Sequence, residues 1–119
     1  MHLTKAEEQV MRHLWELEEG SVQHVRDCFK EPIPSRTTVS TVIRTLETKG
    51  FVDHKVCGRI FTYYPLIRKE DYSKYQLFGM LKNYFNNSFA SMASFFAKES
   101  DMSLQDMEIL LEATKKELQ

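Results

Sequence analysis

The sequence predicts a mostly α-helical protein with one small β-hairpin, arranged as a winged helix-turn-helix domain over residues 1–68 and a helical region over residues 69–119. Three observations support this fold class. Apolar residues recur at helical spacing in three segments before residue 50. The period then changes to that of two short strands. After the hairpin a long helical pattern begins without a Gly/Ser-rich linker.

The first segment begins with a capping box. Thr4 and Glu7 have the spacing at which a hydroxyl and a carboxylate satisfy free backbone N–H groups at a helix start. We therefore expect a helix from about residue 4 to about residue 18, with Gly20 as its stop. Its apolar stripe consists of Val10, Met11, Leu14, Trp15 and Leu17.

Two further helices are predicted before residue 50. Ser21 opens a short helix whose apolar residues are Val22, Val25 and Phe29. Pro32 and Pro34 end it, because neither residue can continue a helix. Ser35 then caps a third helix that ends near Lys49–Gly50, where glycine permits a positive φ.

The third helix has two chemically different sides. One side is apolar and is expected to pack inward: Val39, Val42, Ile43 and Leu46. The opposite side is polar and consists of Thr37, Ser40, Thr41 and Arg44. Short hydroxyl side chains with one guanidinium can enter a DNA major groove without steric block. The alternative for these residues is a merely solvated helix face.

A β-hairpin is predicted next. The segments 51–56 and 59–64 are rich in β-branched and aromatic residues, with Cys57–Gly58 between them as the turn. Pro65 ends the second strand. Three helices followed by a two-stranded hairpin is the element order of a winged helix-turn-helix. The hairpin tip, with Lys55 and Arg59, can then lie along the sugar-phosphate backbone.

The distribution of charge supports contact with DNA although the net charge is −1. Residues 36–59 carry five basic and two acidic side chains, a local charge of +3, whereas residues 71–119 have a local charge of −2. The residues expected to contact DNA are Arg36, Thr37, Thr38, Ser40, Thr41, Arg44, Lys55 and Arg59. Arg44 is the best candidate for a base contact, since a guanidinium reaches guanine O6 and N7. A DNA-binding domain with so little positive charge needs dimerisation to raise its affinity for DNA.

An aromatic helical seam follows the hairpin. Its spacings of 3, 4, 4, 3 and 4 predict one long helix with Phe78, Leu81, Phe85, Phe89, Met92 and Phe96 on one side. Asp101 and Ser103 mark the expected break before a final helix, which adds Leu104, Met107, Leu110 and Leu111. One helical hairpin cannot bury so much apolar surface, so a two-fold dimer through residues 69–119 is predicted.

The sequence gives no sign of an enzyme or a metalloprotein. The histidines share no ligand spacing, and the acidic pairs Glu7–Glu8 and Glu18–Glu19 are placed on helix surfaces rather than in a converging pocket. Cys28 and Cys57 lie outside any CxxC pattern. No catalytic residue, metal or cofactor is therefore proposed. With neither a secretory signal nor a long apolar run, a cytosolic protein without membrane insertion is expected.

The motifs together resemble the penicillinase and methicillin-resistance repressor family, to which copper-responsive CopY-type repressors also belong. The resemblance rests on residues 3–7 and 10–15, on Thr38–Val39 with Thr41 and Leu46, on residues 49–51, and on Gly58–Arg59 with Phe61 and residues 63–65. It implies a homodimeric repressor on a palindromic operator. In the beta-lactamase branch, a membrane sensor with a metalloprotease domain triggers repressor cleavage.

The chain departs from the family at three places. Thr45 stands where an arginine is usual, with Arg44 one position earlier. The bond cleaved in the beta-lactamase branch follows an asparagine before a phenylalanine, and the best match here is Ser94–Phe95. The tail from residue 112 to residue 119 contains no cysteine, which excludes the metal hook of the copper branch.

The function predicted from the sequence is a dimeric, sequence-specific DNA-binding repressor of a resistance-type operon. A second interpretation makes the winged helix a protein-interaction adaptor with a helical docking tail. A third, weaker one lays residues 77–97 on a membrane surface, although this segment has only Lys82 as a cation.

Overall fold

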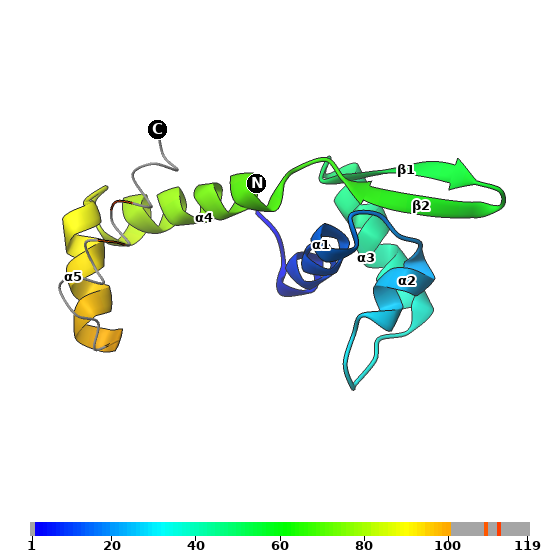
Figure 1. The fold of residues 1–119 in the computed structure, drawn as a ribbon, viewed down its shortest axis with the longest axis horizontal. Coiled ribbons are helices and arrows are strands. Elements are labelled where there is room, and N and C mark those ends of the chain that lie inside the picture. Colours follow the sequence, from blue (N-terminus) through cyan, green and yellow to red (C-terminus); the bar gives the residue numbers. More distant parts are fainter. Residues whose placement is uncertain (1, 101–108, 110–111, 113–119) are drawn as a thin grey trace. The chain divides into compact units, whose positions relative to one another are not determined.

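The computed structural model describes residues 2–100, 109 and 112, and the chain divides into two compact units, Met1–Lys69 and Glu70–Gln119. The first unit contains the helices α1 (Lys5–Leu17), α2 (Val22–Asp27) and α3 (Arg36–Thr48) and the strands β1 (Val52–Cys57) and β2 (Ile60–Pro65) (Figure 1). The second contains α4 (Lys69–Tyr84), which begins at the boundary, and α5 (Phe89–Ser100). The predicted fold class, mostly helical with a winged helix-turn-helix, is confirmed.

The helix starts are those that the caps predict. Thr4 and Glu7 form the expected capping box, in which the backbone N–H of Glu7 donates to Thr4 Oγ1 at 3.2 Å and that of Thr4 donates to Glu7 Oε1 at 2.8 Å. Ser21 and Ser35 accept from the backbone N–H groups of His24 and Thr38 in the same way. Each cap satisfies donors that the first turn of a helix leaves free.

The end of α1 differs from the prediction. Glu18, not Gly20, takes the left-handed conformation that ends the helix, with φ of 69°. Gly20 instead pairs with Tyr63 through two backbone hydrogen bonds of 2.9 and 2.8 Å. A Cβ at position 20 would lie 3.1 Å from the Cβ of His24 and 3.2 Å from Leu17 Cδ1. The glycine therefore permits close packing against His24 and Leu17, and it does not act as the helix stop.

The hairpin turn lies one residue further along than predicted. Cys57 pairs with Ile60, so the two loop residues are Gly58 and Arg59 and not Cys57 and Gly58. Gly58 has φ of +68° at the first loop position, which is the type II′ arrangement. The prediction had the glycine at the second loop position. A turn with glycine at the first position matches the twist of the strands equally well. Pro65 is the last residue of β2, as expected.

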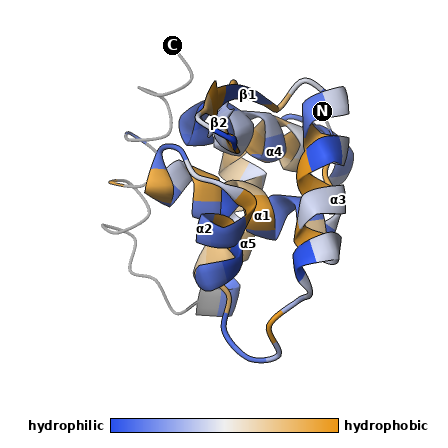
Figure 2. Cartoon of the chain, turned by 90° about the vertical axis from the view of Figure 1, so that its right-hand side faces the viewer, coloured by the Kyte–Doolittle hydropathy of each residue, from blue (hydrophilic) through white to orange (hydrophobic). Residues whose placement is uncertain are grey.

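The core of the first unit lies between the three helices and the base of the hairpin. Met11, Leu14, Val25, Ile43 and Leu46 have no exposed surface. Phe51, Val52 and Tyr63 close the core from the hairpin side and are also buried. Figure 2 shows the hydrophobic residues of α3 on its side toward α1. Of the predicted inner side of α3 only Val42 is half-buried, and the other residues are fully buried.

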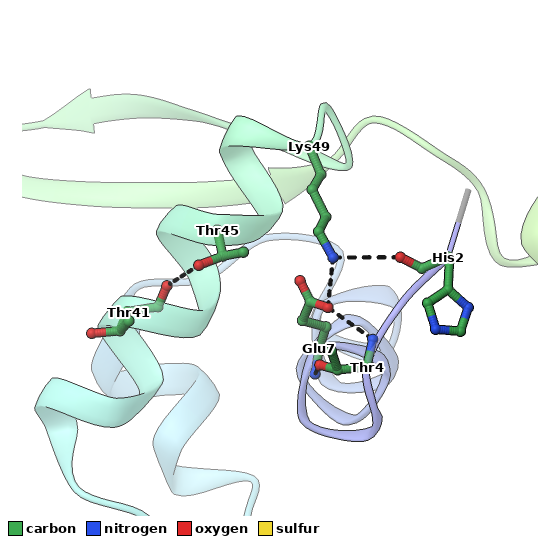
Figure 3. A network of polar contacts seen from close by, with 6 residues as sticks. All are labelled: His2, Thr4, Glu7, Thr41, Thr45 and Lys49. Carbon is green, nitrogen blue, oxygen red and sulfur yellow. Dashed lines mark hydrogen bonds and ion pairs between the residues drawn. The ribbon is translucent and has the colours of Figure 1, made fainter.

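An ion pair joins the end of α3 to the start of α1. Lys49 Nζ donates to Glu7 Oε1 at 2.8 Å and to the carbonyl oxygen of His2 at 3.4 Å (Figure 3). Burial would raise the pKa of Glu7, but the hydrogen bonds from Lys49 and Thr4 outweigh it and the pKa is lowered. The polar network therefore fixes the C-terminal end of α3 against α1.

The second unit contradicts the prediction of one long helix. α4 ends at Tyr84, and Asn86 and Asn87 take positive φ values of 49° and 62° before α5 begins at Phe89. Asparagine tolerates this conformation better than most residues, so the pair ends the helix although the apolar spacing continues. The expected break at Asp101–Ser103 and the final helix from Ser103 lie outside the described residues.

No helix in the part of the chain that the structure describes is long and apolar enough to cross a bilayer.

Candidate nucleic-acid interface

The polar side of α3 borders a groove of about 450 Å³. The groove runs between α3, the start of α2 and the middle of β2. It is lined by Val22, Arg36, Thr37, Ser40, Thr41, Arg44, Phe61 and Tyr63. Most of the α3 residues predicted to contact DNA therefore share one concave surface, next to the wing.

The two arginines of the groove stand at different levels of the helix. Arg36 is the first residue of α3 and Arg44 lies eight positions later, so about 12 Å of helix axis separates them. Both are exposed, and neither forms an ion pair among residues 2–100, 109 and 112. Their guanidinium groups are therefore available to an anionic partner.

Three threonine hydroxyls of α3, those of Thr41, Thr45 and Thr48, donate to carbonyl oxygens of the preceding turn. Thr41 Oγ1 donates to the carbonyl oxygen of Thr37 at 2.9 Å, and Thr45 Oγ1 donates to that of Thr41 at 3.0 Å (Figure 3). Such bonds to the preceding turn use the single hydroxyl proton. Thr41 therefore offers the groove a methyl group and an acceptor oxygen, and not a free donor.

Thr38 is the one predicted α3 contact that the groove does not include. Its hydroxyl lies 2.8 Å from Ser35 Oγ, and its backbone N–H donates to the same oxygen at 3.1 Å. It lines a separate cavity of about 520 Å³ whose other lining residues come from α1, the loop after α2, and α3. The hydroxyl is thus part of the N-cap of α3.

The predicted basic residues of the wing are exposed and differ in their partners. Lys55 in β1 forms an ion pair with Glu19 at 2.7 Å, and this carboxylate raises the pKa of the lysine. Arg59 occupies the second loop position at the hairpin tip. Because the Lys55–Glu19 pair is exposed, solvent screens it and a phosphate can compete for the lysine.

The groove also contains Val22, Phe61 and Tyr63, which the sequence did not indicate. Phe61 and Tyr63 are two residues apart in β2 and so lie on the same face of the strand, a period that the sequence does contain. Burial raises the pKa of Tyr63, and the charge of Glu47 raises it further against a lowering effect of Arg44. Tyr63 is therefore a neutral wall of the groove, and Phe61 is half exposed beside it.

The predicted dimerisation residues of α4 and α5 divide by exposure. Leu81 and Met92 are buried within the chain, and Phe85, Phe89 and Phe96 are half-buried. Phe78 is 49% exposed, and Phe95, at the predicted cleavage position with Ser94, is 50% exposed. Leu104, Met107, Leu110 and Leu111 lie outside the described residues.

Comparison with known proteins identifies relatives along almost the whole chain. The protein family described as "Penicillinase repressor" matches residues 3–116. The methicillin resistance regulatory protein MecI of Staphylococcus aureus (strain N315) is 27% identical over 109 residues, which cover 91% of this chain and 89% of that protein. The penicillinase repressor of Bacillus licheniformis is 26% identical over 106 residues, covering 88% and 83%. The solved structure of a CopR repressor is 30% identical with a TM-score of 0.49, covering 57% of this chain and 100% of that one.

Proposed function

We propose that this chain, which belongs to the penicillinase repressor family, represses transcription by binding as a homodimer to a palindromic operator in double-stranded DNA. The observation that carries the proposal is the groove beside α3. Arg36 and Arg44, which have no ion-pair partner among the described residues, share one exposed surface of the first unit with short polar side chains and the adjacent wing. This is the chemistry that phosphate neutralisation and base recognition together require.

We assign the groove residues to different parts of the DNA according to their chemistry. Arg44, in the middle of α3, suits bidentate contact with guanine O6 and N7. Arg36 at the N-terminal end of the helix suits a phosphate, because the helix dipole there favours negative charge. Thr41 and Phe61 offer apolar surface to a thymine methyl group.

The wing contributes position rather than sequence selection. Lys55 and Arg59 project from the hairpin that follows α3 and are exposed. In this proposal they contact phosphates flanking the major-groove site, which fixes the register of α3 on the duplex.

The homodimer is supported by apolar surface that the second unit leaves exposed. Tyr75, Phe78, Tyr84 and Phe95 are all between 47% and 79% exposed on α4 and α5. Exposed aromatic side chains at this density mark an interaction surface in a globular protein. A second copy of α4 and α5 covers them in a two-fold arrangement, which matches the two-fold symmetry of a palindrome.

Release of the repressor by a membrane sensor metalloprotease follows from the family resemblance. Ser94 and Phe95 are exposed but lie inside α5, whose ends are at Phe89 and Ser100. A protease binds its substrate in an extended conformation, so cleavage at this bond requires local unwinding of α5. We therefore expect cleavage to be slower than at an exposed loop.

The experiment that tests the function starts from DNA. Fragments of the source genome are mixed with the full chain, and the bound fraction is recovered and sequenced. We expect a small set of fragments sharing an inverted repeat, bound with an affinity that falls steeply with salt as counterions are released. Recovery of random fragments, or an affinity unaffected by salt, contradicts the proposal and favours the adaptor interpretation.

A further inference from the structure

The last turn of α3 and the start of β1 bring three metal-ligating side chains together. One donor atom each from Glu47, Asp53 and His54 lies within 4.8 Å of the other two. The sequence did not indicate this group, because its histidines share no ligand spacing. The set consists of one histidine and two carboxylates. Glu47 comes close to the other two only because β1 packs against the end of α3.

The imidazole of His54 is held in a fixed orientation. Its ring stacks on Phe61 with centroids 4.4 Å apart and an interplanar angle of 16°, and it also lies 5.6 Å from the ring of Tyr63. In this orientation Nδ1 is in direct hydrogen-bond contact with Glu47 Oε2. The backbone N–H of His54 donates to Asp53 Oδ1 at 2.8 Å, which places the second carboxylate on the same stretch of β1.

The cluster contains two carboxylates, of which Glu47 is in contact with His54. Neither Glu47 nor Asp53 is paired with a lysine or arginine in the described ranges. The side chains of Glu47 and His54 are about 30% exposed, at 31% and 30%, so water can approach the same point. An imidazole nitrogen and two carboxylate oxygens, with room for water, are a donor set that divalent transition metals accept.

We propose that Glu47, Asp53 and His54 bind one divalent transition-metal ion, and that zinc suits the set best. Zinc takes nitrogen and oxygen ligands at about 2.0–2.2 Å in a tetrahedron, which separates the donor atoms by about 3.3 Å. The three donor atoms, all within 4.8 Å of one another, reach this separation through side-chain rotation.

The ion would bridge α3 to β1 and so join the helix that lines the groove to the wing. This goes beyond the proposed function and does not depend on it, since the ligands are present with or without DNA. Its direct consequence is a metal-dependent gain in the stability of the first unit, because an ion that binds only the folded state stabilises that state.

Zinc titration of the full chain without DNA tests the proposal. The Cys57→Ser background is used because an exposed thiolate is another ligand that zinc prefers. Calorimetry should show one zinc ion per chain and a higher Tm with zinc than with a chelator. Glu47→Gln, Asp53→Asn and His54→Gln should each weaken zinc binding at least about tenfold. His2→Gln is the matched control, since the side chain of His2 is exposed and has no role in the cluster.

Two results overturn the proposal. One is the absence of a stoichiometric binding event at sub-millimolar zinc. The other is a binding event that all three substitutions leave unchanged, which assigns the ion to other ligands. Circular dichroism of each variant checks that it is folded. The His54→Gln variant also loses the ring that stacks on Phe61. If this variant is unfolded, the zinc affinities of the near-isosteric Asp53→Asn and Glu47→Gln variants decide whether the cluster binds the ion.

Discussion

At the scale of single residues, the chain uses its short polar side chains mainly to hold the ends and turns of helices. Thr4, Ser21 and Ser35 are N-caps, and Thr41 donates to the preceding turn of α3. These bonds are local, so the caps could be predicted from sequence spacing alone. On the outer face of α3, neither Arg36 nor Arg44 forms an ion pair within the part of the chain that the structure describes, so these two residues are the first to test.

Arg44→Ala should weaken binding to a selected operator by about 1–3 kcal/mol, which is about 5- to 150-fold, if the guanidinium contacts a base. Fluorescence anisotropy with labelled operator measures this. Arg12→Ala is the matched control, since Arg12 is an exposed arginine of α1 that pairs with Glu8. Equal affinities for the Arg44 variant and the wild type would remove Arg44 from the interface.

Glu7 should make stability depend on pH. Its pKa is lowered in the folded chain, so the stabilisation that its charge provides is present above the unfolded pKa and is lost as pH falls through the folded pKa. Urea unfolding between about pH 6 and about pH 3 should show a smaller loss of stability for Glu7→Gln than for wild type. Glu8→Gln, at an exposed ion pair, is the control and should retain the wild-type slope.

At the scale of elements, the sequence predicted the order of the helices and strands of the first unit and most of their bounds. The prediction was wrong at two places where the local sequence suits more than one backbone arrangement. Glycine serves a two-residue hairpin loop at either position, so the turn was placed one residue early. The apolar spacing from Phe78 to Phe96 continues through Asn86 and Asn87, so the break between α4 and α5 was missed.

Some residues of the groove could not be predicted from the sequence. Its α3 residues were predicted because they lie on one helix face. Phe61 and Tyr63 join them only because β2 packs beside α3, and Thr38 leaves the groove because its hydroxyl contacts Ser35. A helix face can be read from periodicity, whereas a surface shared between a helix and a strand depends on the tertiary fold.

Two glycine substitutions compare the hairpin turn with a helix interior. Gly58→Ala should lower the free energy of unfolding by about 1 kcal/mol or more, because φ of +68° strains any residue with a Cβ. Gly79→Ala in α4 should raise it by up to about 1 kcal/mol, because nothing lies within 4 Å of the added Cβ and alanine favours a helix. Urea denaturation measures both, and effects of the same sign would contradict the backbone assignments.

At the scale of the whole molecule, the chain combines two units with different chemistry. The first unit carries the groove and the local positive charge, and the second carries exposed aromatic side chains on α4 and α5. A small groove with few cations gives one copy only modest affinity, and pairing two copies raises it without any new contact to DNA.

Light scattering should therefore report twice the mass of the 119-residue chain, 14.0 kDa for one copy. The double variant Phe78→Asp/Phe95→Asp places charges on exposed positions of α4 and α5 and should shift the chain toward monomers, because a buried unpaired carboxylate is costly. Lys82→Asp is a control for added negative charge at another exposed position of α4. A wild-type monomer would favour the adaptor interpretation.

The central claim, that two copies place two α3 helices on one duplex, is tested most directly by hydroxyl-radical footprinting of the full chain on a selected operator fragment. We expect two symmetric protected patches whose centres lie about one or two helical turns apart, at multiples of roughly 34 Å. Both patches should weaken together in the Arg44→Ala variant at a concentration that half-saturates the wild type. A single asymmetric patch, or protection unchanged by loss of Arg44, would contradict it.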